Sequence, residues 1–372
     1  GAPAALSRPG LPVAPAPVYE SSVRIVSSGV ATPLSGAQNL ASFGPFAVSD
    51  GAPELASQMV KALAGQGTQA RLLNGNLLGL KTVIITEGLN KGPVTQRHWQ
   101  VLDLCKKLHG SPVRIILLEP MGGTKYGDVS GLKGLSRTLR QEWPDQSVVT
   151  WSVPSEYSVP QQVELVLGAI ASVKTDADLS ATGAYMMEIG AELQLAQIAA
   201  DKANVWFVPG GARGVTAACV VELARRQSGS VFVLAGRSEI VPWPEELPVT
   251  NDMKLLRGAL ISAAKARGEK PALPDVDRQA RALLAGQEVR ETLNKIASAG
   301  ARPVYLQVDM SKPGSIQSAV EQVVREYGPI SGLVHGAGVL ADGLALKKTW
   351  EDVEYVFGPK VEGLANLLGA ID

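Results

Sequence analysis

The residues best suited to chemistry are three glycines that lie where a helix is predicted to begin. Gly210, Gly211 and Gly214 follow a short apolar run in the stretch VWFVPGGARGVTAACVVELARR, residues 205–226. The apolar run predicts a strand, and the amphipathic pattern after the glycines predicts a helix. The first N–H groups of a helix have no partner within it, and glycine lets a bulky anion approach the backbone closely. The stretch therefore predicts a turn that binds the pyrophosphate of a dinucleotide.

The predicted phosphate turn departs from the common dinucleotide fingerprint. Its spacing, Gly-Gly-x-x-Gly, differs from G-x-G-x-x-G. It is closer to the Gly-x-x-x-Gly-x-Gly of short-chain reductases, with Thr216 in the position of the last glycine. A threonine hydroxyl can still serve the start of a helix. The residues assigned to the turn are Gly210, Gly211, Ala212, Arg213, Gly214 and Val215.

Arg237 ends the second predicted strand, VFVLAGR, residues 231–237, and Ser238 follows it. A site for NAD commonly has an acidic residue in this place, which accepts a hydrogen bond from the ribose 2′-hydroxyl. An arginine suits a 2′-phosphate instead, because the pair forms charge-assisted hydrogen bonds. The predicted cofactor is therefore NADPH, with Arg213 as a second positive contact. The alternative is that Arg237 is a solvated charge at the end of a strand.

Two further strand ends supply residues for the same cofactor. Asp309 ends the run VYLQVD, residues 304–309, where its carboxylate can accept from the adenine amino group, and Met310 follows. The fourth strand lies in SGLVHGAG, residues 331–338, whose glycines let the backbone approach the nicotinamide ribose. The residues assigned there are Gly336, Ala337 and Gly338. Because ligands bind at the carboxyl ends of strands in open α/β sheets, the four strand ends fit one site.

The elements around these strands predict a parallel sheet with one unusual connection. A helical pattern, SIQSAVEQVVREYG, joins the third strand to the fourth, and another follows the fourth from residue 349 onward. The second and third strands are joined by an unusually long segment. It contains two helical patterns, 253–268 and 277–300, so we expect a helical insertion at about 239–300. Four strands are fewer than this kind of sheet usually has, and we expect the first strand to lack a neighbour.

A second series of strands and helices precedes the glycine turn. The strand candidates are residues 23–28, 46–50, 70–74, 82–88, 113–119, 148–153 and 185–190, and the helical patterns are 52–65, 95–109, 127–143 and 159–172. The alternation predicts a mostly parallel sheet with helices on both faces. The first turn of this series offers Gly51 and Pro53 but no glycine cluster. This unit is therefore predicted to bind no nucleotide.

Composition argues against several classes of function. The 372 residues include 35 basic and 35 acidic ones, and this net charge of zero gives no electrostatic reason to bind nucleic acid or an anionic membrane. No apolar run is long enough to predict a membrane span, and no metal site is assigned. Cys105 and Cys219 lie in apolar helical runs, which fits a reducing cytoplasm rather than a disulfide scaffold.

The first residues predict a linker. Residues 1–20, GAPAALSRPGLPVAPAPVYE, are rich in alanine and proline, a composition typical of a stiff, extended tether. A chain that opens in this way is interpreted as a domain cut from a longer polypeptide. The alternative is the remnant of an expression tag followed by a disordered end.

Taken together, these motifs resemble the ketoreductase domains of iterative type I polyketide synthases. The second half carries VPGGARGVT, LAGRS, VDMS, VHGAGVLADG and FGPKVEGLANLL, and the first half carries GLSRTLRQEWPD and AYMMEIGAELQ. The insertion and the wording of VHGAGVLAD are most similar to polyunsaturated fatty acid synthases, with enediyne-type synthases as the near alternative. The resemblance implies an α/β fold of two Rossmann-like short-chain dehydrogenase/reductase units in tandem. Residues 21–195 would be a degenerate structural subdomain, and residues 196–372 an NADPH-binding catalytic subdomain that is incomplete at its C-terminus.

The resemblance also implies the reaction, which is hydride transfer from NADPH to a β-ketoacyl phosphopantetheine thioester on an acyl carrier protein. Neighbouring synthase domains would be further partners. Lys360, in FGPKVEG, matches the lysine that lowers the pKa of the proton-donating tyrosine. Asp342, in VLADG, matches the second Asp of a Leu-Asp-Asp motif that accompanies the D (R) 3-hydroxyl, although Ala341 departs at the first. The alternative for Asp342 is a loop carboxylate that caps the next helix.

In the family that this chain resembles, a serine holds the substrate carbonyl oxygen and a tyrosine donates the proton. Neither residue has a match in this sequence. Tyr355 precedes Lys360 by five residues, whereas the short-chain reductase helix needs four to place both on one face, so we reject Tyr355. The chain alone is therefore expected to be inactive, with the missing C-terminal segment of its own domain as a possible partner. Two other functions remain open: a non-catalytic structural module of a megasynthase, and a free-standing short-chain epimerase or dehydratase.

Overall fold

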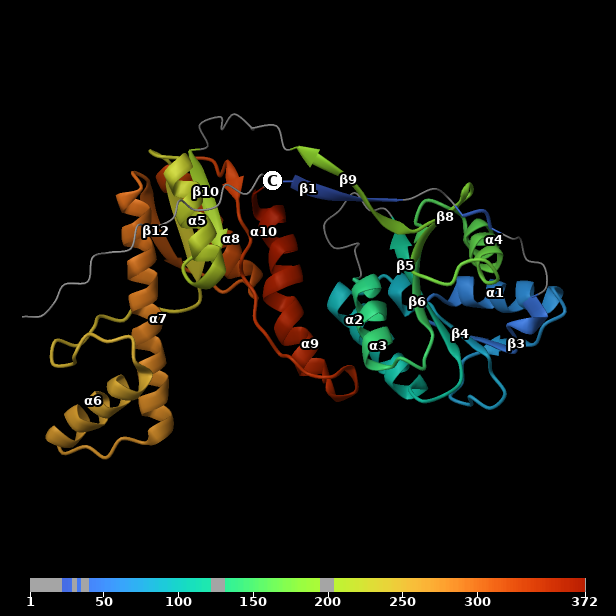
Figure 1. Cartoon of the computed structure of the whole chain (residues 1–372), viewed down its shortest axis with the longest axis horizontal. Helices are drawn as coiled ribbons and strands as arrows, with labels where there is room; N and C mark the ends of the chain where they lie inside the picture. The colour runs from blue at the N-terminus through green and yellow to red at the C-terminus, as the bar shows by residue number, and fades with distance from the viewer. Residues whose placement is uncertain (1–21, 29–31, 35–39, 122–130, 195–203, 372) are drawn as a thin grey trace, which may run out of the picture.

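The computed structural model describes residues 22–28, 32–34, 40–121, 131–194 and 204–371, and the predicted linker at 1–20 lies outside them. The described chain forms a seven-stranded sheet, a four-stranded sheet and a two-stranded ribbon. Figure 1 shows the larger sheets side by side, with α9 (Trp350–Phe357) and α10 (Gly363–Ile371) between them. None of the described helices has the length and apolar content that crossing a bilayer requires.

The first-half sheet has the strand order β3-β2-β4-β5-β6-β7-β8, and only its last pair is antiparallel. Its strands are β2 (Phe46–Val48), β3 (Ala70–Leu72), β4 (Thr82–Ile85), β5 (Arg114–Met121), β6 (Val148–Pro154), β7 (Ala177–Ser180) and β8 (Gly183–Tyr185). The helices are α1 (Pro53–Gly65), α2 (Val94–Leu108), α3 (Leu132–Glu142) and α4 (Val159–Ala169), and short 3-10 turns lie at Leu40–Ser42 and Glu87–Leu89.

Two apolar cores cover the two faces of this sheet. Phe46 and Val48 pack with residues of α1 and α4, whereas Ala47 packs with residues of α2 and α3. Every residue of β4 is buried for the same reason, since a parallel strand covered on both faces has no polar side. The predicted parallel sheet with helices on both faces is therefore confirmed.

Three details of the first half differ from the prediction. The strands β1 (Ser22–Ser28) and β9 (Met187–Gln194) pair with each other in an antiparallel ribbon, outside the main sheet. Strand β7 was not predicted, because its four residues are too few to show a clear period. Helix α3 begins only at Leu132, after Gly131 with a φ of +73°, and residues 127–130 of the predicted helix lie outside the described residues.

The second-half sheet is parallel and has the order β12-β11-β10-β13. Its strands are β10 (Val205–Pro209), β11 (Val231–Gly236), β12 (Arg302–Gln307) and β13 (Gly332–Leu333). Helix α5 (Gly214–Arg226) and part of α7 (Leu273–Ser298) cover one face, where Val208 and Phe232 are buried with Val220 and Val289. Helix α8 (Pro313–Tyr327) and α10 cover the other face.

The edge of this sheet is not where we expected it. The first strand, β10, has neighbours on both sides, because β13 pairs with it through Trp206 and Phe207. The outer strand on that side is therefore β13, which is only two residues long. The expectation that the first strand lacks a neighbour was wrong.

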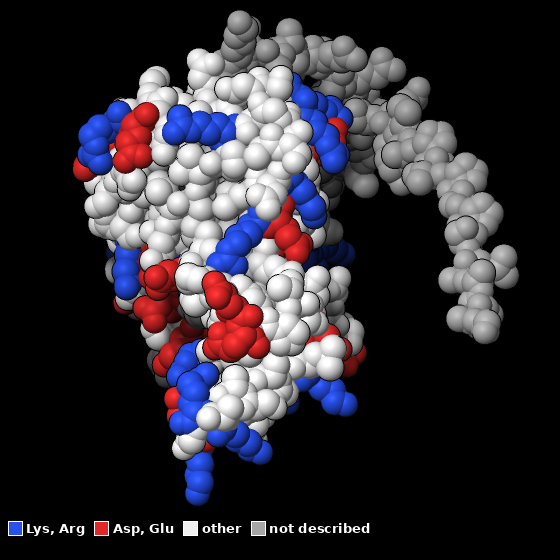
Figure 2. Space-filling view, turned by 90° about the vertical axis from the view of Figure 1, so that its left-hand side faces the viewer, with Lys and Arg blue, Asp and Glu red and all other residues white. Residues whose placement is uncertain are grey.

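The predicted insertion forms a helical hairpin. Helix α6 (Met253–Ala266) packs on the first part of α7 around a small apolar cluster that includes Leu256, Leu260 and Leu283. The rest of α7 lies on the sheet, so one 26-residue helix joins the hairpin to the core (Figure 1). On the face that Figure 2 shows, acidic and basic side chains are interspersed. An ion pair joins the two helices of the hairpin, with 2.6 Å between a nitrogen of Arg257 and an oxygen of Asp277.

The two halves meet through α2 on one side and the segment 345–357 on the other. The rings of Trp99 and Trp350 lie 6.4 Å apart at an edge-on angle, and the rings of His98 and Phe357 lie 4.7 Å apart. The Glu142 carboxylate accepts a hydrogen bond of 2.7 Å from the backbone N–H of Ala345. The first half therefore supports the chain segment that leads from β13 toward Lys360.

Candidate functional site

A cavity of about 450 Å³ lies at the carboxyl ends of the second-half strands. The ends of all four strands contribute residues to it. The residues that line it are Gly210, Ala212, Arg213, Gly214, Thr216, Ala235, Gly236, Arg237, Ser238, Glu288, Val289, Tyr305, Val308, Met310, Gly336, Ala337, Gly338, Val339 and Pro359. Ten of the thirteen residues assigned to the cofactor are in this set. Gly211, Val215 and Asp309 are not.

The glycine turn needs glycine at two positions for different reasons. Gly210 has a φ of +73°, and a Cβ atom there would lie 2.4 Å from the carbonyl oxygen of Gly336. Gly214 has a φ of +62° but faces open space. The N–H groups of Gly210 and Gly211 bond to the carbonyls of Ala235 and Val208. The N–H groups of Gly210 and Gly211 are therefore occupied, and donors for an anion would have to come from farther along the turn, at the start of α5.

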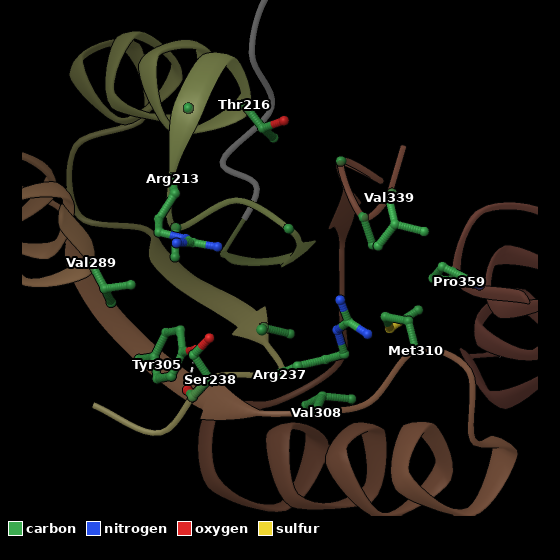
Figure 3. A pocket seen from close by; sticks show the side chains of 18 of the residues that line it. Arg213, Thr216, Arg237, Ser238, Val289, Tyr305, Val308, Met310, Val339 and Pro359 are labelled. Carbon is green, nitrogen blue, oxygen red and sulfur yellow. Dashed lines mark hydrogen bonds between the residues drawn. The ribbon is translucent and has the colours of Figure 1, made fainter. Parts of the chain in front are cut away.

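Two arginines extend into the cavity. Figure 3 shows the side chain of Arg213 leaving the glycine turn and that of Arg237 leaving the end of β11, both directed into the space between the lining residues. Both residues are exposed, and neither has an ion-pair partner among the described residues. Two arginines that form no ion pair within the described parts of the chain, beside a glycine turn, make this end of the cavity suited to a phosphate group.

Tyr305 lines the cavity near Arg213 and Ser238. The sequence analysis did not identify it as a site residue. Its hydroxyl donates a hydrogen bond of 2.7 Å to the backbone carbonyl of Ser238, which fixes the loop after β11. Burial raises the pKa of Tyr305, and the nearby charge of Arg213 opposes that change. An aromatic residue in a strand usually indicates a core position, so the sequence held no signal for a site residue.

The VHGAG segment closes the cavity from the side of β13. The backbone N–H of Gly336 bonds to the carbonyl of Pro209 at 2.8 Å, which continues the pairing beyond the two residues of β13. A Cβ atom on Gly336 would lie 2.4 Å from the Thr216 side chain. Close packing against Thr216 thus explains why residue 336 is a glycine. It also gives a packing role to the threonine, which takes the place of the last glycine of the turn.

Lys360 lies next to this segment but outside the lining of the cavity. Its Cδ atom is 4.0 Å from the point where a Cβ of Gly338 would lie. The ring nitrogen Nε2 of His335 lies 3.2 Å from the Lys360 carbonyl oxygen. Because a carbonyl oxygen can only accept, Nε2–H of His335 is the donor. Burial lowers the pKa of His335, and the hydrogen bond to the Lys360 carbonyl opposes that change. His335 thereby helps to hold the backbone of Lys360.

The helix that carries Lys360 contains a π-helical turn at Gly358–Glu362, between α9 and α10. Such turns are rare and are frequently found at functional sites. The hydroxyl of Thr95, on α2 of the first half, donates a hydrogen bond to the Glu362 carboxylate at the end of this turn. Tyr355 is 49% exposed on α9 and does not line the cavity. The first half therefore contacts the turn that places Lys360.

Three assigned residues lie away from the cavity wall. Asp309 accepts hydrogen bonds from the backbone and the hydroxyl of Ser311, at 3.0 and 2.7 Å, and the hydroxyl is the main reason that its pKa is lowered. Val215 is 83% exposed on α5, and a Cβ on Gly211 would meet the Val208 side chain. Their assignment to the cofactor stays a prediction.

Asp342 is exposed in the loop after β13. The alternative role for Asp342, capping the next helix, belongs to Thr349, whose hydroxyl accepts from the N–H of Asp352 at the start of α9. The preceding residue of the loop, Ala341, accepts a hydrogen bond through its carbonyl from the Lys348 ammonium. A stereochemical role for Asp342 stays a prediction.

In the first half, the turn between β2 and α1 occupies the place that the glycine turn has in the second half. Protein groups already fill it. The Thr86 hydroxyl accepts a hydrogen bond of 3.0 Å from the N–H of Ala52, at the start of α1. A Cβ on Gly51 would lie 2.3 Å from the Cα of Glu87. The Glu87 carboxyl binds the Ser49 hydroxyl, and burial raises its pKa. A phosphate would therefore meet a carboxyl group and an occupied helix start.

No group of histidine, cysteine, aspartate and glutamate side chains suited to hold a metal occurs in the described parts of the chain. Both cysteines are free thiols, with Cys105 buried and Cys219 exposed. Burial raises the pKa of the Cys105 thiol. Cys105 therefore packs as a core residue.

Residues 205–372 match the KR domain family. One component of the polyunsaturated fatty acid synthase of Thraustochytrium sp. is 30% identical over 260 residues, which cover 64% of this chain and 9% of that protein. A polyketide synthase of Bacillus subtilis is 25% identical over 164 residues, which cover 44% of this chain and 2% of that protein. The chain thus spans only a small part of the length of these relatives.

Solved structures show the same fold. A ketoreductase domain from the bacillaene assembly line has a TM-score of 0.56 at 16% identity, over 88% of this chain and 66% of that one. A C2-type ketoreductase from a modular polyketide synthase has a TM-score of 0.62 at 13% identity, over 93% and 70%. The predicted Rossmann-like α/β fold and the resemblance to ketoreductase domains of polyketide and polyunsaturated fatty acid synthases are both confirmed.

Proposed function

Because residues 205–372 match the KR domain family, we propose that they bind NADPH as part of a β-ketoacyl reductase. The substrate of this proposed reaction is a β-ketoacyl thioester carried on the phosphopantetheine of an acyl carrier protein. The observation that carries the proposal is a cavity at four parallel strand ends. It brings together a glycine turn and two arginines that have no ion-pair partner among the residues the structure describes. Polyketide synthase ketoreductases are oxidoreductases, and this cavity suits an anionic dinucleotide.

Residues on both sides of the cavity fit the proposed cofactor. At Gly210 any side chain would fill the space between the turn and the HGAG segment. Arg213, Arg237 and Ser238 lie where a 2′-phosphate would need positive charge and hydrogen-bond donors. Ala337, Gly338 and Pro359 line the opposite side, and the Lys360 side chain lies next to Gly338. When bound there, NADPH supplies a hydride to the substrate carbonyl.

The roles of the chain's own residues follow from this placement. The Lys360 ammonium would favour the ionised form of a nearby phenol and so support proton delivery to the developing alkoxide. His335 keeps the Lys360 backbone in place through its Nε2–H. In the described part of the chain, the tyrosine that lines the cavity is Tyr305, and Figure 3 places it across the cavity from Pro359. Tyr305 is therefore not the proton donor of the proposed reaction.

We further propose that the two halves have different roles. Residues 21–195 form the structural subdomain, and residues 196–372 form the cofactor-binding subdomain. The occupied turn at Gly51 supports a nucleotide-free first half. Its contacts with the segment 345–357 and with Glu362 support a role in bracing Lys360. The open pocket with its two arginines disfavours a purely structural module. The pairing with a degenerate first half disfavours a free-standing epimerase or dehydratase.

Neighbouring synthase domains and an acyl carrier protein are the proposed partners. The support is that the relatives are polyketide and polyunsaturated fatty acid synthases many times longer than this chain. One structural neighbour is a multidomain structure in which adenylation and ketoreductase domains occur together, with a TM-score of 0.60.

Replacing Arg237 by alanine should remove the preference for NADPH over NADH. Charged hydrogen bonds contribute about 1.5–3 kcal/mol each, which corresponds to an about 10- to 100-fold weaker affinity for NADPH. The affinity for NADH should change little, because NADH has no 2′-phosphate. Dissociation constants for both cofactors, measured by calorimetry, give the result.

The matched control is Arg226→Ala, which removes an arginine that pairs with Glu222 near the end of α5. This control should keep the wild-type preference. If Arg237→Ala also keeps it, Arg237 does not bind the 2′-phosphate, and the alternative of a solvated strand-end charge holds.

A further inference from the structure

Helix α7, the second helix of the insertion, forms part of the wall of the proposed cofactor cavity. Glu288 and Val289 are its two lining residues. Neither belongs to the four strand ends from which the site was predicted. An element inserted between β11 and β12 has thus entered the binding site.

The backbone of α7 is held firmly at this point. Val289 is 2% exposed and packs among Val208, Phe232 and Leu234 of the sheet, with Ile296 buried two turns later. The Arg290 guanidinium donates a hydrogen bond to the Val241 carbonyl, which ties the helix to the start of the insertion. The position from which the Glu288 side chain extends is therefore fixed by the core.

The Glu288 carboxylate occupies a hydrogen-bond donor of the glycine turn. Its Oε1 atom accepts from the backbone N–H of Gly214, with 2.9 Å between nitrogen and oxygen. Gly214 is the first residue of α5, so this N–H has no carbonyl partner within the helix. The N–H groups of Gly210 and Gly211 already bond to backbone carbonyls. The carboxylate therefore takes a donor that is suited to a phosphate oxygen.

We propose that Glu288 competes with the phosphates of NADPH for the Gly214 N–H and so sets the affinity of the cavity for the cofactor. This proposal rests on the proposed function, since it takes NADPH as the ligand. A carboxylate and a phosphate that share one N–H donor carry like charges and repel each other. The single N–H also cannot donate a full hydrogen bond to both. Glu288 is exposed, so its side chain can rotate away when the cofactor enters. The contact thus weakens cofactor binding without blocking it.

The competition predicts that removing the charge tightens binding. Glu288→Gln should bind NADPH about 5- to 10-fold more tightly than the wild-type chain, which corresponds to about 1–1.4 kcal/mol. The matched control is Glu291→Gln, which removes the same charge from the same helix. The Glu291 carboxylate accepts a hydrogen bond from Gln287 of its own helix, and Glu291 does not line the cofactor cavity. This control should bind NADPH as the wild type does.

The measurement is a calorimetric titration of the full chain and both variants with NADPH. An unchanged or weaker affinity of Glu288→Gln would overturn the proposal, and a weaker one would mean that Glu288 helps to hold the turn in its binding form.

A second measurement separates this proposal from the proposed function. Amide hydrogen exchange at Gly214 needs no cofactor, and Glu288→Ala should speed it because the N–H loses its acceptor. The same variant should bind inorganic pyrophosphate, used as a probe of the turn, more tightly than the wild type. Faster exchange with tighter pyrophosphate binding but no NADPH binding would count against NADPH as the cofactor only. Unchanged exchange would show that Glu288 does not occupy the turn, and the proposal would fail.

Discussion

Gly210→Ala should reduce NADPH affinity by at least about 100-fold. Residue 210 has a φ of +73°, and a Cβ there would lie 2.4 Å from the Gly336 oxygen and 2.5 Å from the Ala337 nitrogen. Backbone strain of this kind costs about 1–3 kcal/mol by itself. The clash with backbone atoms adds to it, and it is relieved only by separating the glycine turn from the HGAG segment. Both segments line the cavity, so separating them destroys the site.

The control for this variant is Gly229→Ala. Gly229 also has a positive φ, +87°, but a Cβ there meets nothing within 4 Å, and the residue lies outside the cavity. It carries the backbone strain without the clash, and it should keep the wild-type affinity for NADPH. Circular dichroism and thermal unfolding establish that both variants are folded, and calorimetry gives the affinities. Equal NADPH affinity in the two variants would remove the glycine turn from the proposed site.

Residues 1–372 alone should reduce β-ketoacyl thioesters at least about 1,000-fold more slowly than a ketoreductase with its full set of catalytic groups. General acid catalysis typically contributes 10²–10⁴-fold, and electrostatic stabilisation of the developing oxyanion a comparable factor. Among the described residues, the Lys360 side of the cavity has no tyrosine in its lining. Tyr305 lies across the cavity, where its hydroxyl donates to the Ser238 carbonyl.

An assay of NADPH oxidation with a β-ketoacyl thioester tests this, and binding of NADPH to the same sample shows that the site is intact. Lys360→Met is the companion variant, and it should bind NADPH normally because Lys360 does not line the cavity. Turnover by the wild-type chain at a rate within about 1,000-fold of that of a ketoreductase with its full set of catalytic groups would contradict the prediction. The phenylalanine variants of Tyr305 and Tyr355 would then identify the donor, since each removes one hydroxyl and keeps the ring.

The sequence predicted the parts of the site that local patterns determine. A strand followed by glycines and an amphipathic run has one common structure, so the turn at Gly210–Gly214 was found without knowledge of its neighbours. Arg237 was placed by counting from the second strand. The four strands then had to meet at one edge, because parallel strands of a sheet end on the same side. The cavity contains ten of the thirteen assigned residues for this reason.

The residues that the sequence did not predict depend on long-range packing. Glu288 reaches the glycine turn only because Val289 and Ile296 pack α7 against the sheet. Nothing in the local pattern of α7 shows which turn its face will meet. Tyr305 faces the cavity because the space above Gly236 leaves room for its hydroxyl, 2.8 Å from the point where a Cβ would lie. The position of β13 beside β10 was missed because a two-residue strand leaves almost no pattern.

The most direct test of the proposed cofactor site is a calorimetric titration of the full chain with NADPH, followed by NADH. We predict saturable binding of one NADPH per chain, with weaker binding of NADH. One site is expected because the cavity beside Gly210 is open, whereas the matching turn beside Gly51 is occupied by Thr86 and Glu87. Absence of saturable binding would contradict the proposed cofactor site. Binding of two NADPH molecules per chain would contradict the assignment of the first half as a structural, nucleotide-free subdomain.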